Sequence, residues 1–268
     1  MVGTEAVVTS VRAAGAHDVV SLTVPDASPW VHARPGQLVA VPTDPATGRV
    51  LPEVHWLAGA HVDPVHGASV DLLLPVQRQT ATGERVRLLG PLGRGFPAPS
   101  APVPVLLVGH GGGAVPLRWL VEVLRDRGCP VHVLLSASDP DLHLDLVHLR
   151  RHARAVLLAL PEDLPATLRR VLDDPAADPA VVYAAGPVPL LRGVAEEALR
   201  RGLPVRAAAL DLDGPAVVCG TGLCGACDLL VHDDGRGPRQ AGRAGRVLRP
   251  CLEGPVVPGE WLVEEPAR

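Results

Sequence analysis

The sequence predicts a β barrel, then a doubly wound α/β domain with a parallel sheet, then a small cysteine-rich domain. Three observations predict this order. Short apolar segments broken by turn residues fill the N-terminal region, strand-like and helix-like segments alternate in the central region, and four of the five cysteines follow them. We expect the three domains to span residues 1–99, 103–209 and 210–268.

The N-terminal region has the pattern of an antiparallel barrel. Its apolar segments are short, and turn formers such as those in PDASP, RPG and TDPATG separate them. The stretch FPAPSAPVP is rich in Pro and marks the domain boundary. The strands are expected at residues 5–13, 18–24, 37–42, 54–60, 69–74 and 84–89.

The central region alternates between two kinds of segment. VPVLLVG is a continuous apolar run, typical of a strand buried on both faces, and AVPLRWLVEVLRDRG has apolar residues at helical spacing before Gly128. Further strands are expected at residues 130–136, 153–160, 180–186 and 204–210. Further helices are expected at residues 139–152 (with Asp139 as the cap), 161–174 and 187–202. This order predicts a parallel sheet with helices on both faces.

Composition narrows the functional classes. Hydrophobic residues make up 47% of the chain and charged residues 20%, which favours a globular protein over a disordered one. The net charge is −4 with interspersed signs, so nucleic acid is not an expected partner. We find no signal peptide and no apolar run of the roughly 18–20 residues that span a bilayer, so we expect a cytoplasmic protein without a membrane segment.

The cysteine cluster carries the strongest chemical signal. Cys219, Cys224 and Cys227 have the spacing C-x4-C-x2-C, and Cys251 follows in a separate segment, as in plant-type [2Fe–2S] proteins. Two irons need four thiolates, and a loop must wrap them closely with its backbone N–H groups. The loop has the small residues that such an approach needs: Gly220, Gly222 and Gly225.

Other interpretations of these cysteines stay open. A structural zinc site more often uses two similar Cys pairs. A redox dithiol would need only Cys224 and Cys227, in a thioredoxin-like fold that the rest of the chain does not suggest. Four buried structural thiols would not explain the glycines between them. Cys129, far from the cluster, is interpreted as an ordinary buried thiol.

Two glycine turns follow predicted strands. In VGHGGGAVPL, Gly109, Gly111 and Ala114 fit G-x-G-x-x-G/A, which lets a pyrophosphate approach a helix N-terminus. YAAGPVPLL forms a second turn at the end of another strand. Such turns also occur for packing reasons alone, and His110 between the glycines would contact a phosphate or face solvent.

A pair of histidines lies at helical spacing elsewhere. His148 and His152 stand at i and i+4 in LVHLRRH, a spacing that can bind zinc. No H-E-x-x-H glutamate accompanies them, so we interpret this stretch as a solvated helix face.

Taken in order, the motifs resemble one family from end to end. GPLGRGF, VLLVGHGGGAVPL, VYAAGPVPLL and CGTGLCGAC…CLEGPVV resemble the electron-transfer subunits of class 1B dihydroorotate dehydrogenases, within the ferredoxin–NADP reductase superfamily. The resemblance implies a flavin-type barrel, a nicotinamide-nucleotide domain and a C-terminal [2Fe–2S] domain. It also implies a heterotetramer with a catalytic subunit that oxidises dihydroorotate, in pyrimidine biosynthesis.

The resemblance also implies site residues. The metal ligands would be Cys219, Cys224, Cys227 and Cys251. The residues at the NAD(H) site would be Gly109, Gly111, Gly113, Gly186 and Pro187. The residues at the FAD site would be Pro52, His55 and Trp56, with Trp56 either stacking on the flavin ring or packing in the core.

The chain departs from the family pattern at several positions. Leu51 and Val54 stand where the flavin motif R-P-x-S has Arg and Ser, and Ala185 replaces a Cys beside the nicotinamide. Asp211 or Asp213 would substitute for a Glu before the cluster. Two alternatives therefore stay open. One is a subunit that keeps the cluster without flavin and nicotinamide chemistry, and the other is a reductase subunit of a hydrogenase-type or sulfite-reductase-type complex.

Overall fold

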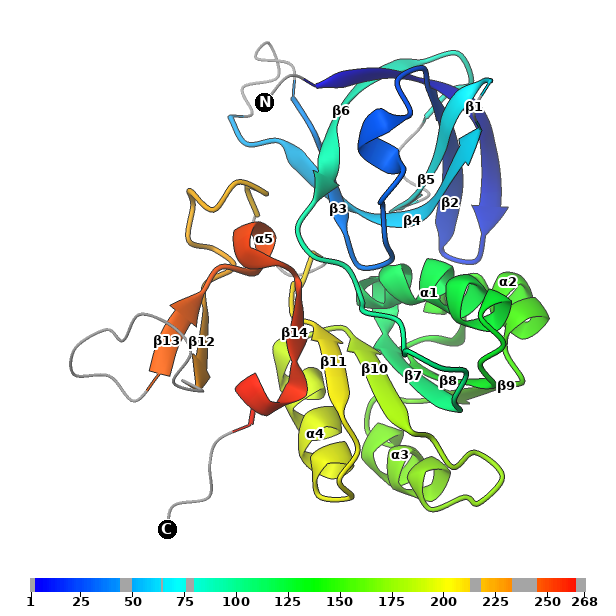
Figure 1. Ribbon diagram of the computed structural model, residues 1–268, viewed down its shortest axis with the longest axis vertical. Coiled ribbons are helices and arrows are strands. Elements are labelled where there is room, and N and C mark those ends of the chain that lie inside the picture. The colour runs from blue at the N-terminus through cyan, green and yellow to red at the C-terminus, as the bar shows by residue number, and fades with distance from the viewer. Residues whose placement is uncertain are drawn as a thin grey trace.

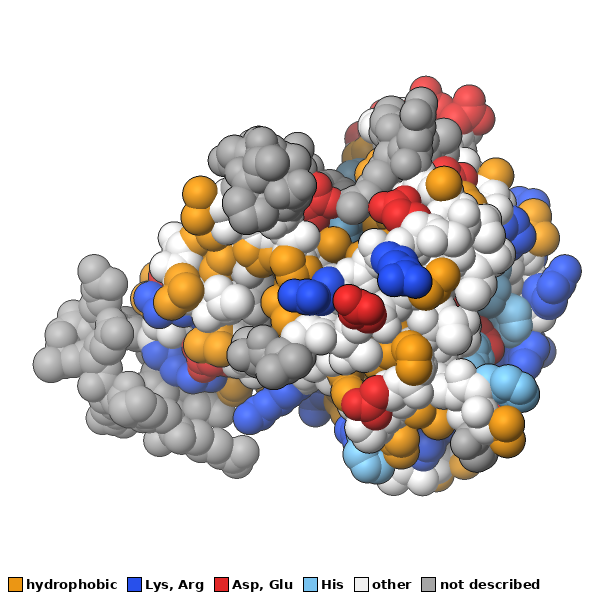
Figure 2. Space-filling view, turned by 90° about the horizontal axis from the view of Figure 1, so that it is seen from above, with side chains coloured by type: hydrophobic (Ala, Val, Ile, Leu, Met, Phe, Trp, Pro, Cys, Tyr) orange, Lys and Arg blue, Asp and Glu red, His pale blue; other side chains and the backbone are white. Residues whose placement is uncertain are grey.

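The structure is a computed structural model that describes residues 3–43, 50–63, 65–75, 80–212, 218–232 and 245–263. Figure 1 shows a barrel at the top, a sheet with helices below it, and the C-terminal part beside both. On the face shown in Figure 2, acidic and basic side chains are interspersed. Among the described residues, no helix has the length and apolar character needed to cross a membrane.

Six antiparallel strands close the barrel: β1 (Thr4–Ala14), β2 (His17–Val24), β3 (Leu38–Val41), β4 (Glu53–Asp63), β5 (Gly67–Pro75) and β6 (Arg85–Leu92). They are ordered β1-β2-β5-β4-β3-β6 around the barrel. Branched side chains such as Val20, Leu22 and Leu57 fill the interior and are fully buried. The predicted barrel is therefore confirmed, with its strand ends shifted by a few residues, as expected when bounds come from turn signals alone.

The second sheet contains six strands: β7 (Val105–His110), β8 (Val131–Ser136), β9 (Ala155–Ala159), β10 (Val181–Ala185), β11 (Val205–Ala208) and β14 (Val256–Pro258). Their order is β14-β11-β10-β7-β8-β9, and the five strands from β7 to β11 are parallel, as predicted. β14 pairs antiparallel with β11, so the C-terminal segment supplies an edge strand to this sheet. The order of connections reverses between β7 and β10, where ligands of such sheets bind.

Four helices cover both faces of this sheet: α1 (Val115–Asp126), α2 (Leu146–His152), α3 (Leu164–Leu172) and α4 (Val188–Leu199). In Figure 1, α1 and α2 lie on the side toward the barrel, and α3 and α4 lie on the opposite side. Leu117, Leu120 and Leu124 form the buried stripe of α1 at helical spacing. Burying each such side chain contributes about 1.5–3 kcal/mol.

The helix predicted over residues 139–152 is shorter than expected. Asp139 caps only a 3₁₀ turn, η4 (Pro140–Leu142), by accepting a hydrogen bond from the Asp141 N–H at 2.8 Å. α2 begins later, where Asp145 accepts from the His148 N–H at 3.2 Å. Asp145 is buried and is paired with an arginine that lies far away in the sequence. This contact holds Asp145 at the position where α2 begins.

That arginine, Arg118 of α1, joins the helices to the barrel. Its guanidinium Nε lies 3.1 Å from Asp145, and its Nη1 donates to the Ala58 carbonyl of β4 at 3.2 Å. Arg118 and Asp145 are both buried. Burial opposes ionisation of Asp145, but the His148 N–H and Arg118 outweigh it and lower the pKa of the carboxyl group. The charge pair therefore fixes α1 and α2 against β4.

Where the structure describes it, the C-terminal part contains four short elements besides β14: β12 (Leu229–His232), β13 (Gly245–Leu248), α5 (Pro250–Glu253) and the 3₁₀ helix η5 (Gly259–Trp261). β12 and β13 form a separate two-stranded sheet. The Arg246 guanidinium lies 4.6 Å from the centre of the Trp261 ring, a cation–π contact that links β13 to η5. The C-terminal part thus contributes to two sheets.

Candidate functional site

The four cysteines of the predicted ligand set lie on two segments that touch each other. Cys219, Cys224 and Cys227 lie on one loop, and Cys251 lies on α5. The Sγ atoms of Cys227 and Cys251 are 3.2 Å apart, although the two residues belong to different segments. The tertiary structure therefore brings the fourth thiol to the three that are clustered in the sequence.

The loop directs backbone N–H groups at a sulfur atom. The Sγ of Cys219 accepts from the N–H groups of Leu223 at 3.2 Å and of Thr221 at 3.4 Å. Gly220 and Gly222 have φ values of +69° and +75°, which L side chains rarely adopt. A Cβ atom on Gly222 would lie 2.8 Å from the Leu252 side chain. Glycine is required here because the chain turns tightly around the thiols.

The pKa values of two of the thiols are shifted in opposite directions. Burial disfavours the Cys219 thiolate, but hydrogen bonds from the Thr221 hydroxyl and from loop N–H groups outweigh burial and lower the pKa of Cys219 to about 6. Burial and the neighbouring Cys227 raise the pKa of Cys251 to about 12. Four thiolates on this loop and the helix beside it would repel one another, and a bound cation would offset that repulsion. An iron–sulfur cluster fits this donor set.

One side of the loop rests on the barrel and the other faces solvent. A Cβ on Gly220 would lie 3.0 Å from the Val54 side chain of β4, so the backbone packs directly on that strand. Cys219 is buried, whereas Cys224 is exposed. Leu223 is 86% exposed and Leu252 is 59% exposed. The site thus lies between the barrel and an apolar surface.

The two glycine turns touch each other at the switch point of the sheet. Gly111 and Gly113 follow β7, and Gly186 and Pro187 follow β10, which pairs with β7. A Cβ on Gly113 would lie 2.8 Å from the Gly186 Cα. Gly109, the residue before the last of β7, pairs with Ala185 of β10. All the residues of the predicted nucleotide set therefore gather at one edge of the sheet.

His110, between the glycines, has a partner that the sequence did not indicate. Its Nδ1 lies 2.7 Å from the Ser136 hydroxyl at the end of β8. Both residues line a cavity of about 350 Å³ together with apolar side chains of α3 and α4 and with Pro187. Ser136 was missed, although a polar residue at the carboxyl end of a parallel strand is a signal for this kind of site.

The residues of the predicted flavin set lie at the start of β4. Pro52 is half-buried before the strand, and the His55 Nε2 lies 3.7 Å from the Glu53 carboxylate. Trp56 is 3% exposed and packs in the core between the barrel and the α/β layer. Its indole N–H has no hydrogen-bond partner among the described residues. The flavin assignment of these three residues stays a prediction, and the core alternative for Trp56 matches its burial.

Of the two acidic candidates before the cluster, Asp211 is half-buried in the segment that leads to the cysteine loop. Asp213 lies outside the described residues.

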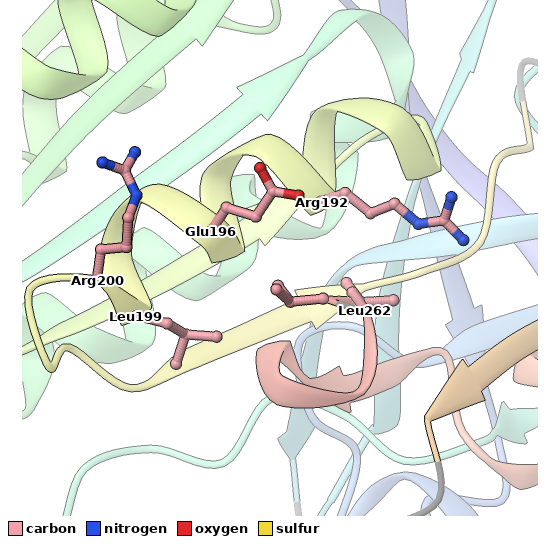
Figure 3. A pocket seen from close by; sticks show the side chains of 6 residues that line it. Arg192, Glu196, Leu199, Arg200 and Leu262 are labelled. Atoms are coloured by element: carbon pink, nitrogen blue, oxygen red, sulfur yellow. The ribbon is translucent and has the colours of Figure 1, made fainter. Parts of the chain in front are cut away.

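A second hollow lies along α4 (Figure 3). It has a volume of about 640 Å³. Arg192, Glu196 and Leu199 of α4 and Arg200 directly after it line one side, and Leu262 of the C-terminal segment faces them. None of the residues that the sequence analysis singled out is among the described residues that line it.

The chain is similar in sequence to curated proteins of one kind. It is 28% identical over 262 residues to the electron transfer subunit of dihydroorotate dehydrogenase B (NAD(+)) from Desulforamulus reducens, covering 93% of this chain and 90% of that protein. It is 30% identical over 240 residues to the subunit of the same name from Shouchella clausii, covering 84% and 85%. A scan against protein-family models gave no match.

Solved structures share the fold. The NADH-dependent reduced ferredoxin–NADP oxidoreductase superposes with a TM-score of 0.69 at 21% identity, covering 96% of this chain and 88% of the other. The ferredoxin reductase of carbazole 1,9a-dioxygenase gives 0.60 at 17% identity, covering 76% and 68%. At these identities the likeness concerns the arrangement of the barrel and the α/β layer.

Proposed function

This chain belongs to the family of dihydroorotate dehydrogenase B electron transfer subunits, and we propose that it carries electrons between NAD(H), FAD and a [2Fe–2S] cluster, to or from a catalytic subunit that oxidises dihydroorotate. The observation that carries the proposal is the cysteine loop, which rests on barrel strand β4 and opens to solvent on its other side. The clustered thiols it needs are kept reduced in the cytoplasm, where we place the protein.

Cys219, Cys224, Cys227 and Cys251 would hold the cluster. A bound [2Fe–2S] group supplies a centre that takes up and releases single electrons. The chain's own part is to stabilise the negative charge of the thiolates. The N–H groups of Leu223 and Thr221 do so at Cys219, and the packing of Gly220 on Val54 keeps solvent from the inner side.

The meeting of the two glycine turns supports the nucleotide site. Backbone N–H groups that precede α1 can bind a pyrophosphate, because the helix end carries partial positive charge and has unpaired donors. Gly113 and Gly186 let the two turns touch, which brings both backbones to the same end of the sheet. His110 and Ser136 add polar groups at the edge of the apolar cavity. We therefore assign Gly109, Gly111, Gly113, Gly186 and Pro187 to NAD(H).

The start of β4 is where we place FAD. Pro52 and His55 are half-buried there, so part of each side chain stays open to a ligand. Leu51 stands where the family pattern has Arg, so a flavin diphosphate loses a charge-assisted contact. We expect FAD to bind but to dissociate more easily than it would from a chain with Arg at this position.

The exposed edge of the cysteine loop supports a protein partner. Leu223 and Leu252 are large apolar side chains next to the exposed Cys224. Apolar side chains gathered on a surface often mark a docking site. We propose that the catalytic subunit covers this edge, in a heterotetramer like that implied by the family.

Anaerobic purification followed by an absorption spectrum and cofactor extraction tests the proposal. We expect about two iron atoms and one FAD per chain, together with NADH-dependent reduction of a dye. Iron without flavin, combined with no NADH-dependent dye reduction, would instead favour a subunit that only relays electrons through the cluster. Co-purification with a hydrogenase-type or sulfite-reductase-type subunit in place of the dihydroorotate enzyme would show that the catalytic partner is a different enzyme.

Leu51→Arg tests the flavin part separately. A guanidinium at this position restores a contact to the diphosphate, so we expect FAD affinity to rise about tenfold. The measurement is flavin fluorescence released during gel filtration of the variant and the parent protein. Leu51→Met is the matched control, because it keeps an apolar side chain of similar size. Equal flavin loss from all three proteins would contradict the placement of FAD at the start of β4.

A further inference from the structure

Three potential metal ligands meet on the helices that face the barrel. Glu122 comes from α1, and His148 and His152 come from α2. A ring nitrogen or carboxylate oxygen from each residue lies within 4.8 Å of the others. The interpretation of LVHLRRH as a solvated helix face was wrong, because the His148 side chain is only 13% exposed and faces α1. The glutamate that the local motif lacks comes from the other helix.

We propose that Glu122, His148 and His152 form a zinc site that joins α1 to α2. Two histidines at i and i+4 lie on one side of a helix, and a carboxylate completes a three-ligand set that leaves a fourth position for water. Ligand atoms around tetrahedral zinc lie about 3.4 Å apart, given metal–ligand bonds of about 2.0–2.2 Å. The ligand atoms now lie within 4.8 Å of one another, so the side chains must move inward to bind one ion.

The hydrogen bonds of both histidines prepare them for a metal. The His152 Nδ1 lies 2.8 Å from the His148 carbonyl, and the His148 Nε2 lies 3.1 Å from the Arg118 carbonyl. A carbonyl oxygen can only accept, so each of these ring nitrogens donates its N–H. The other nitrogen of each ring keeps its lone pair. Metal-binding histidines are commonly oriented in this way.

One buried positive group lies near the site, and its charge disfavours a cation at His148. Arg118 is the nearest buried positive group, and its charge is paired with Asp145 at 3.1 Å. The Glu122 Oε2 lies 3.9 Å from the His148 Nε2, the nitrogen that donates to the Arg118 carbonyl, so the His148 ring or the Glu122 side chain must turn before both bind one ion. Because Arg118 also binds the Ala58 carbonyl of β4, a zinc ion here would stiffen the helix pair that contacts the barrel.

Zinc binding to the full chain, measured by equilibrium dialysis and elemental analysis, tests the site. We expect the parent protein to bind one more zinc ion than His152→Gln does, and the affinity of the site to fall by more than about tenfold in Glu122→Gln. His66→Gln is the matched control, since His66 also pairs with a carboxylate, Asp63 at 3.2 Å, but on an exposed barrel turn. That variant should bind zinc like the parent.

Thermal unfolding gives a second readout. Zinc should raise the melting temperature of the parent and of His66→Gln but not that of His152→Gln, because a ligand that binds only the folded state stabilises it. Equal zinc content and equal melting shifts in the parent and in His152→Gln would overturn the site. Zinc uptake that bleaches the visible absorption of the cysteine cluster would also overturn the proposed site, because it would show that zinc binds to the thiols instead.

Discussion

The cysteine loop and the glycine turns of the sheet both depend on glycine, but for different reasons. In the loop, positive φ angles at Gly220 and Gly222 let neighbouring residues direct their own N–H groups at Cys219. At the sheet edge, Gly113 and Gly186 come from separate strands and are needed because two backbones touch. The first region is assembled mainly by neighbours in the sequence, and the second is assembled by the fold.

The largest expected effect comes from Cys224→Ser, which changes the cysteine loop. Losing one thiolate removes a ligand that the loop cannot replace, so we expect iron content and visible absorption to fall nearly to zero, with lower stability. Absorption spectroscopy and iron analysis measure this. Cys129→Ser is the control, because Cys129 is buried at a distance from the loop and should leave the spectrum intact. An unchanged spectrum in Cys224→Ser would contradict the ligand assignment.

Arg118→Met tests the contacts between distant segments. It leaves the buried carboxylate of Asp145 without its buried partner, which should cost about 3–5 kcal/mol of unfolding free energy. Chemical denaturation measures the loss. Arg12→Met is the matched control, because Arg12 contacts the same carboxylate at 3.3 Å but is 55% exposed, so its loss should cost about 1 kcal/mol or less. Equal costs for both variants would show that burial of the pair is irrelevant.

Gly113→Ala tests the glycine turns of the sheet without changing the cysteine loop. The new Cβ would lie 2.8 Å from the Gly186 backbone, so the turns must move apart, and NADH affinity should fall about tenfold to 100-fold while the cluster spectrum is kept. Fluorescence titration with NADH measures this. Gly202→Ala is the control for backbone strain, with φ of +73° and no atom within 4 Å of its Cβ. Unchanged NADH affinity in Gly113→Ala would place the nucleotide elsewhere.

The smallest effect concerns Tyr183, which ties β10 to the segment after the barrel. Its hydroxyl donates to the Pro97 carbonyl at 2.8 Å, and burial raises its pKa to about 12. An unfolded tyrosine ionises near pH 10, so the folded state favours the neutral form. This contribution is complete below pH 10 and is lost as the pH rises from about 10 to 12.

Tyr183→Phe should therefore cost about 1 kcal/mol at neutral pH and remove the part of the alkaline destabilisation that belongs to this residue. Denaturation at several pH values measures it. Tyr183 is the single tyrosine of the chain, so tyrosinate absorbance reports its ionisation directly. Ionisation near pH 10 in the folded protein would contradict the burial argument.

Local patterns predicted much of this fold, because burial on a strand or helix face leaves a period in the sequence. The apolar run of β7 and the helical stripe of Leu117, Leu120 and Leu124 are of this kind. The late start of α2 was missed, since Asp145 is held by Arg118 on another helix. Ser136 was missed because its partner, His110, belongs to a different strand.

The sequence by itself determined the order of elements, the spacing of Cys219, Cys224 and Cys227, and the glycines between them, because each depends on residues close along the chain. Only the tertiary structure decided that β14 joins the parallel sheet and that Glu122 faces His148, and it brings Cys251, which the sequence predicts as the fourth ligand, to Cys227. These contacts join segments whose spacing leaves no periodic signal. They exist because burying the shared core brings those segments together.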